Sequence, residues 1–298
     1  MMKRLISANA SEVLSMTSAE LKQSIKASEG RVILSENVAP RESFIGDITN
    51  SEIARAFGAD MILLNGIDVL NPVVFGLDSS ESFVEELHHL VGAPIGVNLE
   101  PVDDQAEMSE SKLAISEGRK ASIKTMQKIE GLGLDFVCLT GNPGTGVSND
   151  EIEKAIKMTK EHFSGLVIAG KMHGAGVSES VADLPTIEKF LAAGADIILV
   201  PAVGTVPGFD EIELKEIVKA VHKADGLVLS AIGTSQESSD TDTVKDIAIR
   251  NKICGVDIQH IGDAGYGGVA PVENIYAMSK ALRGVRHTVS RVARSVNR

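Results

Sequence analysis

Short aliphatic runs alternate with longer amphipathic segments along most of the 298 residues. Eight times, a segment with helical periodicity ends in Gly and an aliphatic run follows within one to three residues. These glycines are Gly30, Gly58, Gly92, Gly133, Gly165, Gly194, Gly226 and Gly255. Gly is favoured just after a helix because it adopts positive φ without strain, and a buried parallel strand reads as an uninterrupted aliphatic run. Each period therefore predicts one strand followed by one helix.

The same periods contain signals for helix starts. Ser, Thr or Asp stands three residues before Glu at Thr49/Glu52, Ser82/Glu85, Ser148/Glu151 and Asp210/Glu213. This spacing is typical of a capping box. The hydrophobic periodicity predicts helices over residues 51–57, 82–91, 119–129, 151–163, 184–193, 211–222, 243–251 and 273–282.

Eight strand–helix units predict a single α/β domain over residues 1–298, a (β/α)8 TIM barrel. The barrel should span residues 30–283, with an extra N-terminal helix within residues 1–29 and a basic, helical extension over residues 284–298. The alternative is an open, doubly wound sheet, which usually has fewer strands and a Gly-rich nucleotide turn after the first strand. Here that turn reads Ser35-Glu-Asn-Val-Ala-Pro40, without the G-x-G-x-x-G pattern.

Composition excludes several classes of protein. The chain is 43% hydrophobic and carries a net charge of −12, so it can bury a large core and lacks the basic surface that nucleic acid requires. The absence of Trp also argues against stacking platforms for bases. There is no apolar run long enough for a membrane span and no signal peptide pattern, which predicts a cytoplasmic protein. Cys138 and Cys254 should be small buried residues rather than metal ligands.

In barrels of this type the chemistry lies at the C-terminal ends of the strands. Lys171 and His173 follow the fifth run and form the only cationic pair among these positions. A Lys there can neutralise an anion or stabilise an enolate, and a His can move protons near neutral pH. Glu36 and Glu100, after the first and third runs, are the candidate general bases. We expect these four residues to be catalytic.

Polar and Gly-rich segments at other strand ends predict substrate binding. Asn65, Asn98 and Asn142 are candidates for contacts with a small anionic, phosphorylated substrate. Backbone N–H groups at glycine turns bind phosphate, often after strands seven and eight of a barrel. The candidates in those two loops are Gly233, Thr234, Ser235, Gly262, Gly265 and Gly267. Asp68, together with Glu36 and Glu100, could instead hold a divalent cation through oxygen ligands.

The chain resembles a family of uncharacterised bacterial TIM-barrel proteins that are often encoded near sugar phosphotransferase systems. The resemblance is carried by Gly46-Asp-Ile-Thr-Asn50, Pro94-Ile-Gly-Val-Asn-Leu-Glu-Pro101, Thr140-Gly-Asn-Pro-Gly-Thr-Gly146 and His260-Ile-Gly-Asp-Ala-Gly-Tyr-Gly-Gly268. Its members are labelled phosphoenolpyruvate phosphonomutase or haloacid-dehalogenase-like. Dehalogenase chemistry needs an Asp-x-Asp element after the first strand, where this chain has Ser35-Glu-Asn37.

A second, local resemblance concerns metal binding. Asp263-Ala-Gly-Tyr-Gly-Gly268 is similar to the Asp-x-Gly-Tyr-Gly stretch of the phosphoenolpyruvate mutase/isocitrate lyase superfamily. In that superfamily the stretch belongs to the early strands, whereas here it follows the eighth. The resemblance implies Mg2+ as a cofactor, with Asp263 near the metal.

These observations favour an enzyme of lyase or isomerase type that acts on a small phosphorylated sugar derivative or oxoacid. One alternative is a Mg-dependent enzyme similar to phosphoenolpyruvate mutase. Another is a non-catalytic regulatory protein that binds a sugar phosphate. The basic tail contains Arg286, Arg291, Arg294 and Arg298 on roughly one side of a helix, and we expect it to contact a neighbouring subunit of a homo-oligomer.

Overall fold

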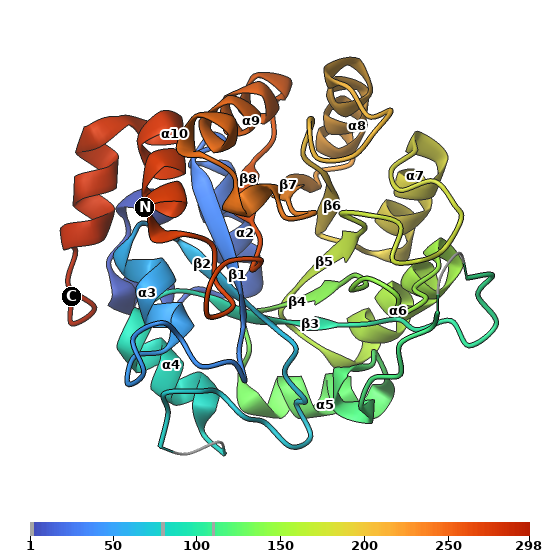
Figure 1. Ribbon diagram of the computed structural model, residues 1–298, viewed down its shortest axis with the longest axis horizontal. Helices are drawn as coiled ribbons and strands as arrows, with labels where there is room; N and C mark the ends of the chain where they lie inside the picture. Colours follow the sequence, from blue (N-terminus) through green and yellow to red (C-terminus); the bar gives the residue numbers. More distant parts are fainter. Residues whose placement is uncertain (1–2, 79–80, 109–110) are drawn as a thin grey trace.

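The computed structural model describes residues 3–78, 81–108 and 111–298, and its strands form a closed parallel barrel (Figure 1). Neighbouring strands follow chain order, and β1 pairs with β8 to close the sheet. The strands are β1 Val32–Val38, β2 Met61–Asn65, β3 Ile95–Leu99, β4 Phe136–Leu139, β5 Leu166–Gly170, β6 Ile197–Pro201, β7 Leu227–Ile232 and β8 Ile258–Ile261. The prediction of a (β/α)8 barrel is confirmed, and the open-sheet alternative is wrong.

Helices surround the barrel and connect its strands (Figure 1). They are α3 Asn50–Ala56, α4 Phe83–Val91, α5 Ile123–Leu132, α6 Asn149–His162, α7 Leu184–Ala193, α8 Glu211–Lys223, α9 Thr241–Cys254 and α10 Val272–Ala293. Thr49, Ser148 and Asp210 each accept a backbone N–H bond as predicted caps. Ser82 makes no such bond, and its hydroxyl donates to Glu86 Oε1 at 2.8 Å.

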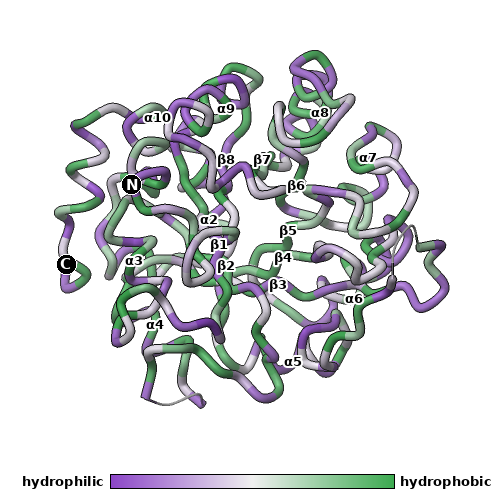
Figure 2. Tube along the Cα trace, viewed as in Figure 1, coloured by the Kyte–Doolittle hydropathy of each residue, from purple (hydrophilic) through white to green (hydrophobic). Residues whose placement is uncertain are grey.

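The buried apolar residues form two clusters on opposite faces of the strands. Alternate strand residues such as Ile33, Val97 and Val167 pack outward against the helices. Their neighbours, such as Val32 and Leu166, pack inward. Apolar residues colour most of the strands green in Figure 2. Both faces of every strand are buried, as expected for a parallel barrel.

The residues before β1 close one end of the barrel interior. They include η1 Leu5–Ser7, α1 Ala10–Val13 and α2 Ser18–Lys26. Leu5, Leu21 and Ile25 are fully or almost fully buried and belong to the same apolar cluster as the inward-facing strand residues. The predicted N-terminal helical extension therefore contributes to the core at the N-terminal ends of the strands.

One type of side-chain hydrogen bond occurs four times at the N-terminal ends of the strands. An Asp precedes each even-numbered strand in the pattern Gly-x-Asp, and its carboxylate accepts a backbone N–H bond from the preceding odd-numbered strand. The pairs are Asp60 with Ile33 at 2.9 Å, Asp135 with Ile95 at 2.8 Å, Asp196 with Val167 at 3.0 Å and Asp257 with Val228 at 2.9 Å. Each bond satisfies a backbone donor at a strand start that the sheet leaves open.

The basic C-terminal extension packs against its own barrel. α10 is interrupted at Gly284, where φ is 70°, and the following residues turn back toward the N-terminal segments. Arg291 donates to the carbonyl of Ala59 at 2.9 Å, and Arg294 donates to Asn9 Oδ1 at 2.6 Å. We expected these two arginines to face a neighbouring subunit, whereas here they contact the same chain. The homo-oligomer stays a prediction.

Two further expectations concern the chain as a whole. Cys138 and Cys254 are both free and buried, as predicted. None of the helices in the described part of the chain has the length and apolar character needed to cross a membrane.

Candidate functional site

At the C-terminal ends of the strands, the layer of side chains inside the barrel is polar. Val32 and Leu34 point inward, so the two-residue period of the strand also directs Glu36 inward. The same alternation brings Asn65, Asn98 and Thr140 to the C-terminal ends of β2, β3 and β4. All four side chains line a cavity of about 560 Å³, called the mouth cavity below. Side chains from strands far apart in the sequence therefore meet at one site.

Glu36 and His260 form a buried pair in this layer. Glu36 Oε2 lies 2.9 Å from His260 Nε2, and the two residues are 3% and 0% exposed. Burial raises the pKa of Glu36 to about 8, and the nearby carboxyls of Glu237 and Glu100 act in the same direction. Burial lowers the pKa of His260 to about 4. Both directions favour a neutral pair near neutral pH, in which Glu36 keeps its proton.

The three predicted asparagines belong to one hydrogen-bond network. Asn65 and Asn142 exchange two side-chain amide bonds, of 2.9 and 3.0 Å. Asn65 also donates to Asp263 Oδ2 at 2.9 Å, and Asn98 donates to Asn65 Oδ1 at 3.2 Å. All of these residues line the mouth cavity. The network fixes the loops after β2, β4 and β8 relative to one another.

Glu100 supports this network from outside the cavity lining. Glu100 is 1% exposed, and its Oε1 accepts a hydrogen bond from Arg119 Nη2 at 2.7 Å. Its carboxylate also accepts the backbone N–H of Asn142 at 2.9 Å and the side-chain amide of Asn142 at 3.0 Å. The structure therefore places this predicted catalytic residue as a support for Asn142.

The structure separates Lys171 from His173. Leu166 and Ile168 of β5 point inward, and Lys171, the first residue after the strand, keeps the outward phase, whereas His173 lies in a loop that no longer follows the alternation. Lys171 is 1% exposed, pairs with Glu179 and is absent from the residues that line the mouth cavity. Burial lowers its pKa. His173 does line the cavity, and its Nδ1 accepts the backbone N–H of Ala175 at 3.0 Å.

The predicted phosphate loops contribute in part. Gly233, Thr234, Ser235 and Gly262 line the mouth cavity. Thr234 and Ser235 adopt φ values of 57° and 72°. Gly265 and Gly267 do not line it. A Cβ on Gly265 would collide with the carbonyl of Val269, and one on Gly267 with the backbone of Phe44. These two glycines allow close packing between loops.

Two further carboxyl groups face the cavity. Burial raises the pKa of Asp263 to about 6, with a further contribution from Glu36. Glu237, in η3 Gln236–Ser238, was not predicted from the sequence. It is 3% exposed, and Oε1 accepts the N–H of Ala264 at 3.1 Å. Burial raises its pKa. The only sequence signal for it is an acidic residue in the loop after the seventh strand.

The two predicted metal ligands are not brought together at the cavity. Asp263 lines it, whereas Asp68 is absent from its lining and accepts the N–H groups of Leu70 and Asn71 at 2.9 and 3.0 Å. Asp68 therefore stabilises its own loop. Among residues 3–78, 81–108 and 111–298, no group of three His, Cys, Asp or Glu side chains is arranged to hold a metal ion.

Within the part of the chain that the structure describes, three buried polar atoms of the cavity lining lack a hydrogen-bond partner. They are Asn98 Oδ1, Thr140 Oγ1 and Glu237 Oε2. A buried polar atom without a hydrogen bond is costly, so such atoms are normally satisfied by a ligand or by water. Because their side chains line an open cavity, this cavity is the candidate binding site for a polar ligand.

Comparisons with solved structures identify the same architecture. A 2,3-dimethylmalate lyase of the phosphoenolpyruvate mutase/isocitrate lyase superfamily is 10% identical, with a TM-score of 0.51 over 83% of this chain and 80% of that chain. A phosphoenolpyruvate phosphomutase from Streptomyces platensis subsp. rosaceus is 16% identical, with a TM-score of 0.50 over 82% and 80%. At this identity the similarity shows the fold alone, and at that level the expected resemblance to the superfamily is confirmed.

The sequence comparisons place the chain in a family. A search of curated proteins finds no significant match. The model of a family described as a domain of unknown function (DUF7916) matches residues 6–298, and the chain therefore belongs to that family.

Proposed function

We propose that the protein is an acid–base enzyme, a lyase or isomerase, that acts on a small hydroxylated oxo compound, either a sugar derivative or an oxoacid. The observation that carries this proposal is Glu36, a buried carboxyl at the base of the mouth cavity with its pKa raised to about 8. Such a group is protonated at neutral pH and can donate a proton to a substrate oxygen.

Asp263 complements Glu36. Its pKa of about 6 leaves it mainly ionised at neutral pH, so it can accept a proton. Two carboxyls whose environments set their pKa values apart are the usual assignment of acid and base in such a site. Asp263 Oδ2 is held by Asn65, and the other oxygen is the one that would meet the substrate. This role replaces Glu36 and Glu100 as the candidate bases.

The proposed reaction passes through an enol. Asp263 takes a proton from the carbon next to the substrate carbonyl while Glu36 gives its proton to the carbonyl oxygen. In an isomerase, a proton then returns to the former carbonyl carbon while the hydroxyl on the neighbouring carbon loses its proton, so that the neighbouring carbon becomes the new carbonyl. In a lyase, Asp263 instead takes the proton of a hydroxyl two carbons from the carbonyl carbon. The bond between this hydroxyl-bearing carbon and the carbon next to the carbonyl breaks, which gives a new carbonyl, and its electrons form the enol as Glu36 protonates the carbonyl oxygen. His260, with its proton on Nε2, would donate to Glu36 Oε2 and leave the carboxyl proton on Oε1.

The lining also supports the substrate class. Asn98 Oδ1 and Thr140 Oγ1 have no hydrogen-bond partner within the described part of the protein, and their side chains line the cavity, which supports a hydroxylated substrate. No Lys or Arg occurs among the described residues that line the cavity, so a phosphate or carboxylate would rely on the backbone of Gly233–Ser235 and on neutral carboxyl groups.

We further propose that this enzyme is cytoplasmic, acts in carbohydrate metabolism and forms a homo-oligomer. The two free, buried cysteines fit a reducing compartment.

The test is proton exchange in deuterated water. The protein is incubated with a panel of ketoses, sugar phosphates and 2-oxoacids, and loss of the proton next to the carbonyl is followed by proton NMR. We expect exchange with at least one compound, a loss of 100-fold or more in Asp263→Asn and Glu36→Gln, and no change in Asp104→Asn, whose side chain is 90% exposed. Binding without exchange would favour the regulatory alternative, and exchange that survives both cavity variants would refute the assignment.

A second candidate is the Mg-dependent mutase or lyase. It is favoured by two carboxyl groups, Glu237 and Asp263, that line one cavity and by the unpartnered Glu237 Oε2. Mg2+ often binds through one or two carboxylates and several waters, so Asp263 and Glu237 would hold it. When bound, the ion would stabilise negative charge on a substrate oxygen.

A further inference from the structure

Glu237 is a buried carboxyl group of the mouth cavity that has no role in the acid–base reaction proposed above. It is 3% exposed and lines the cavity. Within the described part of the chain, its Oε2 has no hydrogen-bond partner. A buried carboxyl oxygen without a partner is costly unless a ligand or water satisfies it. Glu237 is therefore a candidate for contact with the substrate.

Contacts from several segments hold this carboxyl group in place. Its Oε1 accepts the N–H of Ala264 at 3.1 Å, from the loop after β8. Asn274 of α10 donates to the carbonyls of Glu237 and Ser239 at 2.9 and 2.7 Å. Gly262 leaves room for the carboxyl group, since a Cβ there would lie 2.5 Å from Oε1. Such support from distant segments is typical of a side chain that is pre-organised for function.

The turn before η3 is strained. Thr234 and Ser235 have φ values of 57° and 72°, in a region that residues other than Gly rarely adopt and β-branched residues least of all. Backbone strain persists only where the surrounding structure enforces it, and it concentrates at functional sites. Both residues line the mouth cavity and lead directly into η3, which carries Glu237. The strain therefore supports a functional role for this turn.

The isomerase form of the proposed reaction needs an acceptor for the hydroxyl proton. Asp263 serves the carbon and Glu36 serves the carbonyl oxygen. His173 is unsuited, because its Nδ1 accepts the N–H of Ala175 and a neutral ring then carries its proton on Nε2. Glu237 is the remaining carboxyl group in the described lining. Burial raises its pKa, so its carboxylate holds a proton more tightly than an exposed glutamate does.

We propose that Glu237 is a third catalytic residue, the base that takes the proton of the substrate hydroxyl as the neighbouring carbon becomes the new carbonyl. This inference rests on the proposed function in its isomerase form. Glu36 gives one proton to the carbonyl oxygen, Glu237 receives one from the hydroxyl, and Asp263 returns to the substrate the proton that it took. Water in the cavity carries the proton from Glu237 back to Glu36 after the product leaves.

The first experiment separates enol formation from isomerisation. Proton NMR in deuterated water follows both the loss of the proton next to the carbonyl and the appearance of the isomer, with a panel of ketoses and sugar phosphates. In Glu237→Gln we expect exchange within about twofold of the wild type and isomer formation slower by about 100-fold or more. Glu29→Gln is the matched control, because the Glu29 side chain is 77% exposed; it should change neither rate.

The outcomes distinguish this inference from the proposed function. Equal losses of exchange and of isomer formation in Glu237→Gln would show that Glu237 only maintains the site, and an unchanged rate of isomer formation would show that it is not needed. Either result refutes the inference and leaves the proposed function standing. Exchange by the wild type without any isomer refutes the isomerase form and the inference with it. Absence of exchange with every compound refutes the proposed function.

The second experiment does not depend on turnover. Crystals of the wild-type protein are soaked with glycolohydroxamate, whose two adjacent oxygens resemble those of the enediol, in the presence of EDTA. We expect one oxygen within hydrogen-bond distance of Glu237 Oε2 and the other beside Glu36. This result would support the contact between Glu237 and the substrate even if no compound in the panel exchanges. A hydroxamate bound away from Glu237, or a cavity without hydroxamate, would refute it.

Discussion

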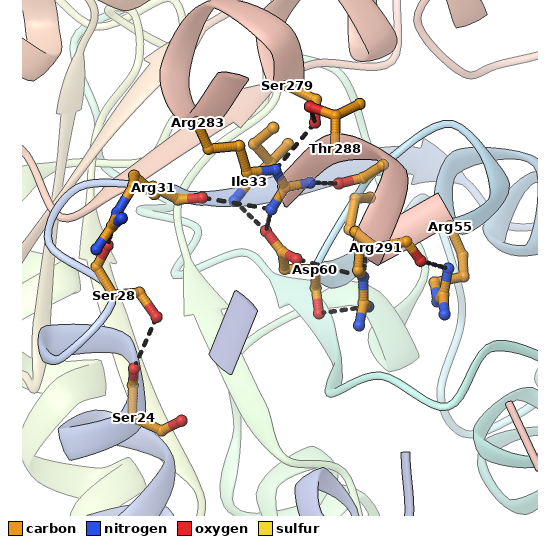
Figure 3. Close-up of polar contacts among 12 residues, drawn as sticks. Ser24, Ser28, Arg31, Ile33, Arg55, Asp60, Ser279, Arg283, Thr288 and Arg291 are labelled. Atoms are coloured by element: carbon orange, nitrogen blue, oxygen red, sulfur yellow. Dashed lines mark hydrogen bonds and ion pairs between the residues drawn. The ribbon is translucent and has the colours of Figure 1, made fainter. Parts of the chain in front are cut away.

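Arg283 and Asp60 form a fully buried ion pair, with 2.6 Å between Nη1 and Oδ2, that joins α10 to the residue before β2. Arg291 approaches the other carboxylate oxygen of Asp60 at 3.3 Å from the C-terminal extension (Figure 3). Asp60 also accepts the N–H of Ile33, so one carboxylate connects a strand of the barrel with both helical stretches of α10.

Replacing Asp60 should therefore be strongly destabilising. Asp60→Ala leaves two buried guanidinium groups without their counter-ion, which costs about 3–5 kcal/mol of unfolding free energy. Asp196→Ala is the matched control, because Asp196 bonds the N–H of Val167 in the same way but pairs with the partly exposed Lys160. Urea unfolding of both variants measures the difference. Equal losses would show that the backbone bond, rather than the arginines, dominates.

Glu36 makes stability depend on pH. Its pKa rises from an ordinary value of 4.5 to about 8 in the folded protein, so between these pH values the folded state binds more protons than the unfolded state. The contribution of Glu36 to stability therefore falls as pH rises through this window. Gln cannot ionise, so Glu36→Gln should unfold at a higher temperature than the wild type at pH 8 and show a smaller difference at pH 5. Calorimetric melting at both pH values checks this, and a variant that is less stable at pH 8 would contradict it.

Lys171 should act on the loop after β5 rather than on the chemistry. Lys171→Met removes the ion pair with Glu179 and should loosen residues 171–183, which carry Met172 and His173 into the cavity lining. We expect faster amide exchange in this loop and a raised KM with an unchanged pH profile. Lys154→Met, which breaks only an exposed pair with Glu151, should change neither. A fall in kcat with an altered pH profile would return Lys171 to the reacting groups.

The sequence predicted the fold better than the direction of individual side chains. The repeated Gly followed by an aliphatic run was sufficient for eight units, because helix ends and buried strands leave local signals. The run Leu166-Val-Ile-Ala-Gly170 is apolar at every position, since both faces of β5 are buried. Such a run does not show which of its positions face the barrel interior and which face the helices, so the outward direction of Lys171 could not be predicted from it.

Other parts of the site depend on contacts between distant segments. Glu237 lies in the short helix η3, and the loop after β8 holds its carboxylate through the N–H of Ala264. The role of Glu100 depends on Arg119, which follows it by a long connection. In contrast, the repeated Gly-x-Asp before the even strands was visible in the sequence and would have located the buried Asp60.

Magnesium distinguishes the two proposed mechanisms. In the acid–base mechanism the carboxyls around the mouth cavity work as neutral acid and ionised base, so EDTA should leave turnover unchanged and Mg2+ should not raise the melting temperature. In the Mg-dependent alternative, Asp263 and Glu237 hold the ion, so Mg2+ should stabilise the wild type and have no effect on Asp263→Asn. Asp68→Asn is the matched control, because Asp68 bonds its own loop outside the cavity lining. Stabilisation by Mg2+ that Asp263→Asn abolishes and Asp68→Asn retains, together with loss of turnover in EDTA, would refute the metal-free mechanism.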